Sequence, residues 1–477
     1  MGFNTNRIKS ASAWSFLEAG SNTLLGLVTI VFLARILEPN DYGKIATAQF
    51  ISGFLLIILT LGISEIILQK KDLSQAQIQT FWTASIFLSF LSILICMMIG
   101  FIFLIQNQGL IGKILFFESI NVGLSVLSII PTALIFRELI LKKFALRNIF
   151  TKLVFFIISV PLVFNGFGLW SVVYANSIQN IVAFIILIYL TKNYLPRKLG
   201  FNKDIFFSMI NFGFFVMLEN LLWSFLNRVL GILIAIFHGP AALGLYHMGT
   251  KLTDTILNIL NTSITRITLP IFAQVQDDKE KLLYSFQSAT YYFNMISIPI
   301  FVTFGMTADN WVPLLLGESW LSVLPIIQII SGMYAIMYTR MFVGVAVKAV
   351  GRSKDFLYLS FVAAIITLIV VFFTRNMNLE TMLISLALGR IFLTIPLGMY
   401  LLNKICDINI KEQIKPVYIP VSIGLTLFFT FYFFNYFSNF SYLVGFSLDL
   451  LLFFLIVIVY FLFLKKKNLL KWNGSSS

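Results

Sequence analysis

A row of polar side chains interrupts an apolar stretch of the sequence at residues 245–269. Its members recur at steps of four and three residues, which places them on one face of a helix. They are His247, Lys251, Asp254, Asn258, Asn261 and Thr265. At about 1.5 Å per residue this polar stripe is roughly 27 Å long, close to the hydrocarbon thickness of a bilayer. We predict that it lines a water-filled cavity; hydrogen bonding between packed helices, with Lys251 and Asp254 neutralising each other, is the alternative.

Further ionisable residues lie inside apolar segments. A charge at mid-bilayer costs at least about 2.5–3.5 kcal/mol, so such residues usually face a cavity and serve function. The cations are Arg228, Arg340 and Arg390, and the acids are Glu18, Glu219 and Asp449. We predict that Glu18 and Glu219 bind a coupling ion or pair with an arginine. Asp449 is expected at a helix contact, and Glu118 and Glu318 at the outer interface.

The elements that carry these residues are membrane helices. Of the 477 residues, 59% are hydrophobic and 11% charged, against roughly 25% charged in soluble domains. This composition excludes a soluble enzyme, a disordered chain and a nucleic-acid-binding domain. Fourteen apolar segments predict an all-α polytopic membrane protein with 14 transmembrane helices. Residues 206–237, 245–269 and 282–304 are the seventh, eighth and ninth.

Positive charge orients the predicted helices. With a cytoplasmic N-terminus, 26 of the 34 lysines and arginines fall in cytoplasmic segments, four in outer segments and four within spans. Because basic loops stay in the cytoplasm, this distribution predicts that both termini are cytoplasmic. The basic side would face anionic lipid, which accounts for the net charge of +14 without a nucleic-acid partner.

Motifs for catalysis and metal binding are missing from the sequence. Two cysteines and two histidines are too few for a disulfide framework or a metal cluster. The chain has no GxSxG, HExxH or P-loop sequence, so we expect no catalytic residues, no metal, no cofactor and no ATP-driven step.

Three features repeat at an offset of about 200 residues. Pro39-x-x-x-Gly43 corresponds to Pro240-x-x-x-Gly244, and Glu18 to Glu219; Glu118-Ser119 corresponds to Glu318-Ser319. We predict two pseudo-symmetric six-helix bundles, residues 1–200 and 201–403, related by an axis along the membrane normal. Residues 404–477 would supply two extra transmembrane helices and a basic cytoplasmic tail. Two parallel bundles with substrate between them form a transporter; a scaffold is the alternative.

Several motifs resemble one family over roughly residues 10–400. The more specific ones run from Gln276 to Leu282 (QDDKEKL) and from Trp311 to Trp320 (WVPLLLGESW), and Leu37 to Gly43 (LEPNDYG) is shared more broadly. They resemble Wzx-like polysaccharide and O-antigen flippases related to the colanic acid exporter, within the multidrug, oligosaccharidyl-lipid and polysaccharide exporter superfamily. The chain departs from the family after Gly244-Leu245-Tyr246, where His247-Met248-Gly249-Thr250 replaces an Asn-Arg-Ala-Tyr-like run and Lys251 becomes the substitute cation.

The resemblance implies a flippase, not an enzyme, for cell-surface polysaccharide and lipopolysaccharide biosynthesis. It would move an undecaprenyl-diphosphate-linked oligosaccharide across the bacterial inner membrane by alternating access, among membrane lipids and beside polymerase or chain-length machinery. The diphosphate would then meet a cationic trap of Lys251, Arg228, Arg340 and Arg390, because guanidinium binds phosphate in a forked geometry. A lipid II flippase and a multidrug cation exporter are the alternatives within the superfamily. A membrane-bound glycan polymerase or ligase is a further one.

Overall fold

Helices make up nearly all of the chain. The computed structural model describes residues 5–466 apart from 61, 70–72, 107, 139, 197, 438 and 439, and this part contains no β-strand. A helix satisfies its peptide groups within one segment, which hydrocarbon requires of any spanning element. Twelve segments of the described part are long and apolar enough to cross a membrane. The chain is therefore a polytopic, almost entirely helical membrane protein.

Two places account for the difference between these twelve spans and the fourteen expected. The helix α9 (Lys203–Gln274) contains both the seventh and the eighth predicted segment, joined through a kink at Gly239, where φ is 81°. Only one span, Arg228–Leu260, is recognised there. The ninth predicted segment lies in α10 (Lys279–Met306), which is not among the twelve. Its buried face carries the polar side chains Gln287, Thr290, Asn294 and Ser297.

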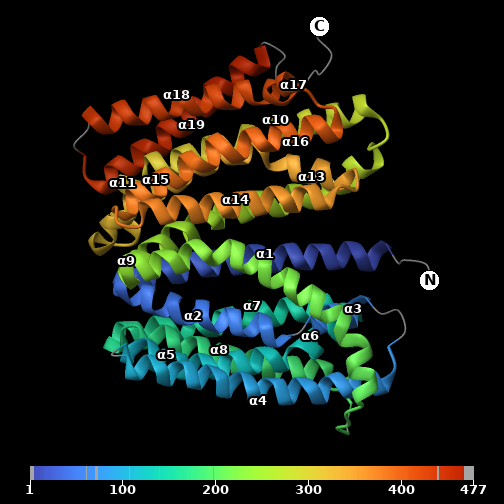
Figure 1. Cartoon of the computed structure of the whole chain (residues 1–477). Helices are drawn as coiled ribbons and strands as arrows, with labels where there is room; N and C mark the ends of the chain where they lie inside the picture. Colours follow the sequence, from blue (N-terminus) through green and yellow to red (C-terminus); the bar gives the residue numbers. More distant parts are fainter. Residues whose placement is uncertain are drawn as a thin grey trace. The chain divides into compact units, whose positions relative to one another are not determined.

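The chain forms two compact units, of which the first comprises Met1–Gly244. Its helices run side by side (Figure 1), with α4 against α5, α1 against α7, α7 against α8 and α2 against α5. The elements are α1 (Thr5–Ala34), α2 (Pro39–Thr60), α3 (Ile63–Gln69), α4 (Gln75–Ile105), α5 (Gly109–Leu127), α6 (Ile129–Arg137), α7 (Leu141–Leu162), the π-helical η1 (Val163–Phe167), α8 (Trp170–Thr191) and the first part of α9.

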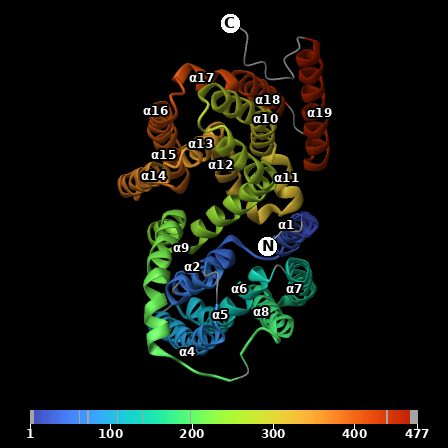
Figure 2. The ribbon, with the colours of Figure 1, turned by 90° about the vertical axis from the view of Figure 1, so that its right-hand side faces the viewer.

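The second unit comprises Leu245–Ser477. Here α10 packs against both α12 and α18, while α19 contacts α11 and lies at the edge of this unit (Figure 2). Besides the rest of α9 and α10, the elements are α11 (Ala308–Leu315), η2 (Glu318–Val323), α12 (Leu324–Met337), η3 (Tyr338–Arg340), α13 (Met341–Ala349), α14 (Ser353–Thr374), α15 (Leu379–Gly389), η4 (Arg390–Thr394), α16 (Ile395–Cys406), α17 (Ile410–Ile414), η5 (Lys415–Val417), α18 (Tyr418–Phe437) and α19 (Tyr442–Lys466).

The two Pro-x-x-x-Gly motifs of the sequence touch each other within the first unit. A Cβ added at Gly43 would lie 1.6 Å from the Pro240 carbonyl oxygen, and one added at Gly244 would lie 1.8 Å from the Pro39 carbonyl oxygen. Each glycine thus admits the backbone of the other motif, as small residues do where membrane helices cross closely. The contact is reciprocal, which is the relation expected of two symmetry-related motifs; the repeat itself stays a prediction.

The sequence QDDKEKL begins α10. The Asp278 side chain caps this helix by accepting a hydrogen bond from the Lys281 backbone nitrogen at 3.1 Å. Its other carboxylate oxygen lies 2.8 Å from Lys281 Nζ. Hydrogen bonds from the Lys281 side chain and backbone hold the pKa of Asp278 below its ordinary value. Lys279 pairs with Asp407, the left-handed residue that ends α16, so this stretch ties α10 to α16.

We expect Gly43→Ala to destabilise the protein, because its methyl group would overlap the Pro240 carbonyl and push α2 away from α9. Overpacking of this kind costs typically about 1–3 kcal/mol. Thermal unfolding of the purified protein in detergent measures the effect. Gly26→Ala is the matched control, because a Cβ at Gly26 has nothing within 4 Å. Equal melting temperatures for the two variants would show that the crossing is looser than described.

Candidate functional site in the second unit

An acid and two tyrosines form the polar centre of the second unit. Asp254 on α9 accepts a hydrogen bond of 2.6 Å from the Tyr334 hydroxyl on α12. Tyr334 packs edge-on against Tyr338 at 5.1 Å between ring centroids, and Phe301 of α10 contacts both rings. The Asp254 carboxylate is thus held by one hydroxyl at an aromatic wall, and it forms no ion pair among the described residues.

Arg390 lies within electrostatic range of the same centre. The guanidinium lies close enough to Tyr246 and Tyr338 to interact electrostatically with both hydroxyls. Its Nη2 donates a hydrogen bond of 3.3 Å to the Thr367 hydroxyl, whereas its buried Nε has no hydrogen-bond partner. A guanidinium carries five N–H donors, so this cation keeps donors for a further acceptor.

Two interruptions of helical geometry lie next to these side chains. Arg390 begins the π-helical turn η4 in the middle of the span Leu379–Cys406. Tyr338 begins the 3₁₀ turn η3 inside the span Glu318–Ala349. Such turns within helices frequently occur at functional sites. Inside a membrane they are tolerated where the backbone is covered by protein or lines a cavity.

The remaining described members of the polar stripe follow the same stretch of α9. Lys251 and Asn258 are exposed in the folded chain, and His247 and Asp254 are half-buried. The side chain of Asn261, also predicted for the site, lies outside the described residues, as does that of Thr265.

Arg228 belongs to the first unit rather than to this centre. Its guanidinium lies over the Phe50 ring, 5.8 Å from the centroid, and against the backbone of α2 at Gly53. A Cβ at Gly53 would lie 2.5 Å from an Arg228 nitrogen. The face of α2 that carries Phe50 and Gly53 therefore receives a cation.

Arg340 has a protein partner. Its Nη2 donates a hydrogen bond of 2.5 Å to the Gln413 side chain on α17. Gln413 is buried, and its amide nitrogen donates to the Met399 and Ile408 carbonyl oxygens at 3.1 and 2.7 Å. Of the predicted cationic trap, Arg390 thus lies within electrostatic range of the centre, and Arg340 is hydrogen-bonded to a buried glutamine. The buried Nε of Arg340, like that of Arg390, has no hydrogen-bond partner.

The predicted acids have different surroundings. Glu18 accepts a hydrogen bond of 2.5 Å from Asn148, whose side-chain oxygen accepts one from Arg147, so an arginine is linked to this acid. The Glu219 side chain lies outside the described residues. Asp449 accepts a hydrogen bond of 2.8 Å from Asn310 and joins α19 to α11, which agrees with the expected helix contact.

Tyr334, Tyr338 and Thr367 were not predicted from the sequence as site residues. A usable signal existed, since the two tyrosines are four residues apart on one helix and precede Arg340. Tyrosine inside a span is easily interpreted as an apolar ring, because only its hydroxyl group needs a partner.

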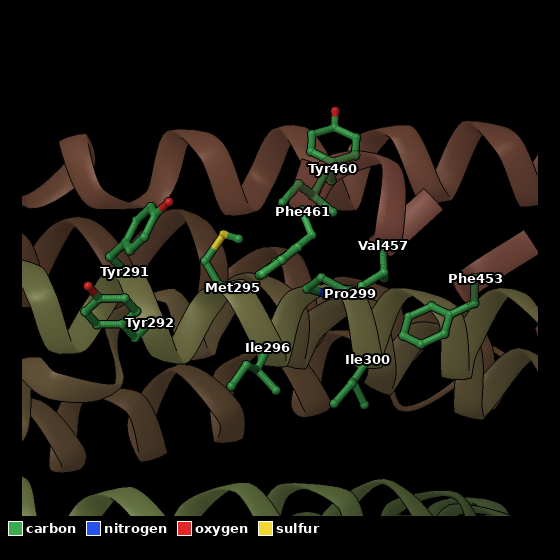
Figure 3. A pocket seen from close by; sticks show the side chains of 11 residues that line it. Tyr291, Tyr292, Met295, Ile296, Pro299, Ile300, Phe453, Val457, Tyr460 and Phe461 are labelled. Carbon is green, nitrogen blue, oxygen red and sulfur yellow. The ribbon is translucent and has the colours of Figure 1, made fainter. Parts of the chain in front are cut away.

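An apolar groove lies between α10 and α19 (Figure 3) and has a volume of about 510 Å³. The lining side chains come from α10, α18 and α19; they are Tyr291, Tyr292, Met295, Ile296, Pro299, Ile300, Ile423, Phe453, Val457, Tyr460 and Phe461. Tyr292, Ile296 and Phe461 are exposed, so the groove opens onto the surface that faces lipid. Among the described residues, no group of three or more His, Cys, Asp or Glu side chains is placed to hold a metal ion.

Comparisons with known proteins agree with the resemblance seen in the sequence. Residues 32–325 match the family described as polysaccharide biosynthesis protein. The lipopolysaccharide biosynthesis protein WzxC of Escherichia coli is 26% identical over 340 residues, 67% of this chain and 65% of that protein. The succinoglycan biosynthesis transport protein ExoT of Rhizobium meliloti is 22% identical, over 69% and 66% respectively. The alignments thus span about two thirds of these relatives, and they confirm the resemblance seen in the sequence.

The fold has a counterpart among solved structures. The lipid II flippase MurJ in an inward closed conformation superposes with a TM-score of 0.73 over 95% of this chain and 99% of that one, at 11% identity. At this identity the likeness concerns the fold alone. A MOP superfamily transporter from Pyrococcus furiosus superposes with a TM-score of 0.57 over 84% of this chain and 95% of its own.

The contact between Arg340 and Gln413 predicts a structural role for both side chains. We expect Arg340→Ala and Gln413→Ala each to lower the free energy of unfolding by about 1–3 kcal/mol, because each leaves a buried polar partner unsatisfied. The double variant should cost less than the sum of the two. Thermal unfolding of the three variants in detergent measures this coupling. Strict additivity would mean that the two side chains act independently.

Proposed function

The chain belongs to the family of polysaccharide biosynthesis proteins, and from this premise we propose that it is a Wzx-like flippase. Its substrate would be an undecaprenyl-diphosphate-linked oligosaccharide, which it moves from the cytoplasmic to the outer leaflet of the bacterial plasma membrane by alternating access. The names of the E. coli and R. meliloti relatives, with their biosynthesis and transport roles, support the substrate class.

The observation that supports this proposal most strongly is the hydrogen bonding of the Arg390 guanidinium. A guanidinium placed in the middle of a span is costly unless it serves a purpose. Here it makes one long hydrogen bond and keeps a buried, unpaired Nε. A diphosphate offers several anionic oxygens that a planar guanidinium binds in pairs. A cationic drug would instead be repelled by this side chain, which favours the anionic substrate over the multidrug alternative.

The polar stripe of α9 would accompany the sugar. Lys251 and Asn258 are exposed, and Asp254 accepts from a tyrosine hydroxyl. These donors and acceptors suit the hydroxyl groups of a glycan, which cannot enter hydrocarbon without replacing their hydrogen bonds to water. In this proposal the head group crosses along the stripe, and His247 and Asn261 continue the same face.

The apolar groove between α10 and α19 would hold part of the lipid tail. Its lining is aromatic and aliphatic, and it opens on the lipid-facing surface. An isoprenoid chain gains nothing from a wet cavity, so the tail stays outside while the head group crosses. The groove would bind the tail through burial of apolar surface alone.

The proposal includes a topology. The 26 basic residues assigned to cytoplasmic segments support a cytoplasmic location of both termini. Fourteen spans, with residues 1–200 and 201–403 as two bundles and the last two helices outside them, remain part of this proposal. Arg228 would serve the same anionic path from α9, and Glu18 and Glu219 would be its candidates for ion coupling.

We expect Arg390→Ala to reduce glycan export by about 10- to 100-fold, the equivalent of losing charge-assisted hydrogen bonds worth about 1.5–3 kcal/mol. Arg390→Lys should restore export only in part, because it keeps the charge and loses the fork. The measurement is the leaflet distribution of undecaprenyl-linked oligosaccharide in cells, with a deletion strain as reference for inner-leaflet accumulation. Normal export by Arg390→Ala, at normal abundance, would contradict this role.

We expect single cysteines along the polar stripe to react with a membrane-impermeant thiol reagent in a seven-residue rhythm. The background lacks Cys96 and Cys406, both of which are buried. Reactive variants should be His247→Cys, Lys251→Cys, Asp254→Cys and Asn258→Cys. Inert ones should be Gly249→Cys, Leu252→Cys and Ile256→Cys, which lie on other faces of α9. Uniform labelling, or none, would identify the stripe as a packing contact between helices.

A further inference from the structure

Glu118 has no role in the proposed passage of the substrate. The sequence suggested an interfacial position for it and for its repeat counterpart Glu318. Glu318 is indeed exposed, but Glu118 is 6% exposed within the first unit. Glu118 is buried because it lies on the α5 face that packs against neighbouring helices, among them α8.

Within the described part of the chain, no cation forms an ion pair with this carboxylate. Of the helices packed against α5, α4 and α8 contain no charged residue. The charged residues on the others are Asp41 and Lys44 on α2 and Arg137 on α6, and α5 itself adds Lys113. None of them forms an ion pair with Glu118 among the described residues. The Cys96 thiol of α4 lies within its electrostatic range and supplies no positive charge.

Two asparagines surround the carboxylate. Asn176 of α8 donates a long hydrogen bond of 3.3 Å to Glu118 Oε1. Asn121 follows Glu118 by three residues, so it shares its helix face, and its side chain lies beside the carboxyl. Asn121 is 4% exposed; its amide nitrogen can reach only the Glu118 carboxylate, and its amide oxygen has no hydrogen-bond partner. A buried amide oxygen without a partner is costly.

We propose that Glu118, Asn121 and Asn176 form a binding site for a monovalent metal cation, with sodium as the natural occupant. One carboxylate supplies a single negative charge, which suits a single positive charge. Amide and carboxylate oxygens are the ligands that hard cations prefer. The two amides can turn their oxygens inward, because the nitrogen and oxygen positions of an asparagine are interchangeable in shape. A proton on Glu118 would also remove the charge, and its O–H could donate to one amide oxygen, whereas a cation would draw the oxygens of both amides toward itself.

Ligand-dependent stability tests this site without any transport measurement, so its outcome is separate from that of the flippase proposal. The full-length protein in lipid nanodiscs is unfolded thermally in sodium chloride and in choline chloride, at equal ionic strength and pH. A ligand that binds only the folded state raises the melting temperature with its concentration. We expect the melting temperature to rise with sodium and not with choline.

The variants are Glu118→Gln and Asn121→Ala, with Glu318→Gln as the matched control at the repeat-related, exposed position. We expect both site variants to lose the sodium-dependent shift and the control to keep it. If Glu118→Gln does not fold, Asn121→Ala and the wild type decide the question. The proposal is overturned if the wild type shows no sodium dependence, or if both site variants retain it. It is equally overturned if the melting temperature changes with pH and is the same in sodium and in choline, because a proton would then be the occupant.

Discussion

The interior of a bilayer offers a peptide group no hydrogen-bond partner, and the rest of this structure depends on that constraint. It forces the described chain into helices, since a helix pairs its own backbone. It also favours hydrogen bonds from many side-chain hydroxyl groups to backbone carbonyl oxygens of their own helix. Thr47, Thr80 and Thr191 each donate to the carbonyl oxygen four residues earlier, at 2.8 Å. Helical geometry is broken by η3 and η4 where tyrosine, arginine and threonine side chains gather, so the exceptions identify the polar centre of the second unit.

Hydrocarbon also removes the usual reason for helices to associate, because lipid tails are as apolar as leucine. Close packing at small residues takes over this task. The crossing of Pro39-x-x-x-Gly43 with Pro240-x-x-x-Gly244 is the clearest case, since each glycine receives a carbonyl of the other motif. The same device lets Arg228 lie against α2 at Gly53, where any side chain would displace the guanidinium. Glycine thus decides both how helices approach and where a cation fits.

The ionisable side chains within the apolar segments have three kinds of surroundings. Arg340 and Glu18 are hydrogen-bonded to buried or half-buried amide side chains, Gln413 and Asn148. Arg390 and Asp254 lie near an aromatic wall, each with one side-chain hydrogen bond. Glu118 lies beside amide groups and forms no ion pair within the described part of the chain. The second and third arrangements are the ones that leave room for a ligand, whereas residue type alone would have grouped all five together.

The sequence by itself determined the class of protein. Its apolar segments require membrane helices, its motifs identify the family, and the 3.6-residue period places Lys251, Asp254 and Asn258 on one face. Only the tertiary structure decided what lies opposite each face. It alone gave Asp254 the partner Tyr334 and Arg340 the partner Gln413, buried Glu118, and assigned Arg228 to the first unit. The physical reason is that periodicity is a property of one helix. The partner of a buried charge comes from another helix, often more than 70 residues away in the chain, and is set by how the helices pack.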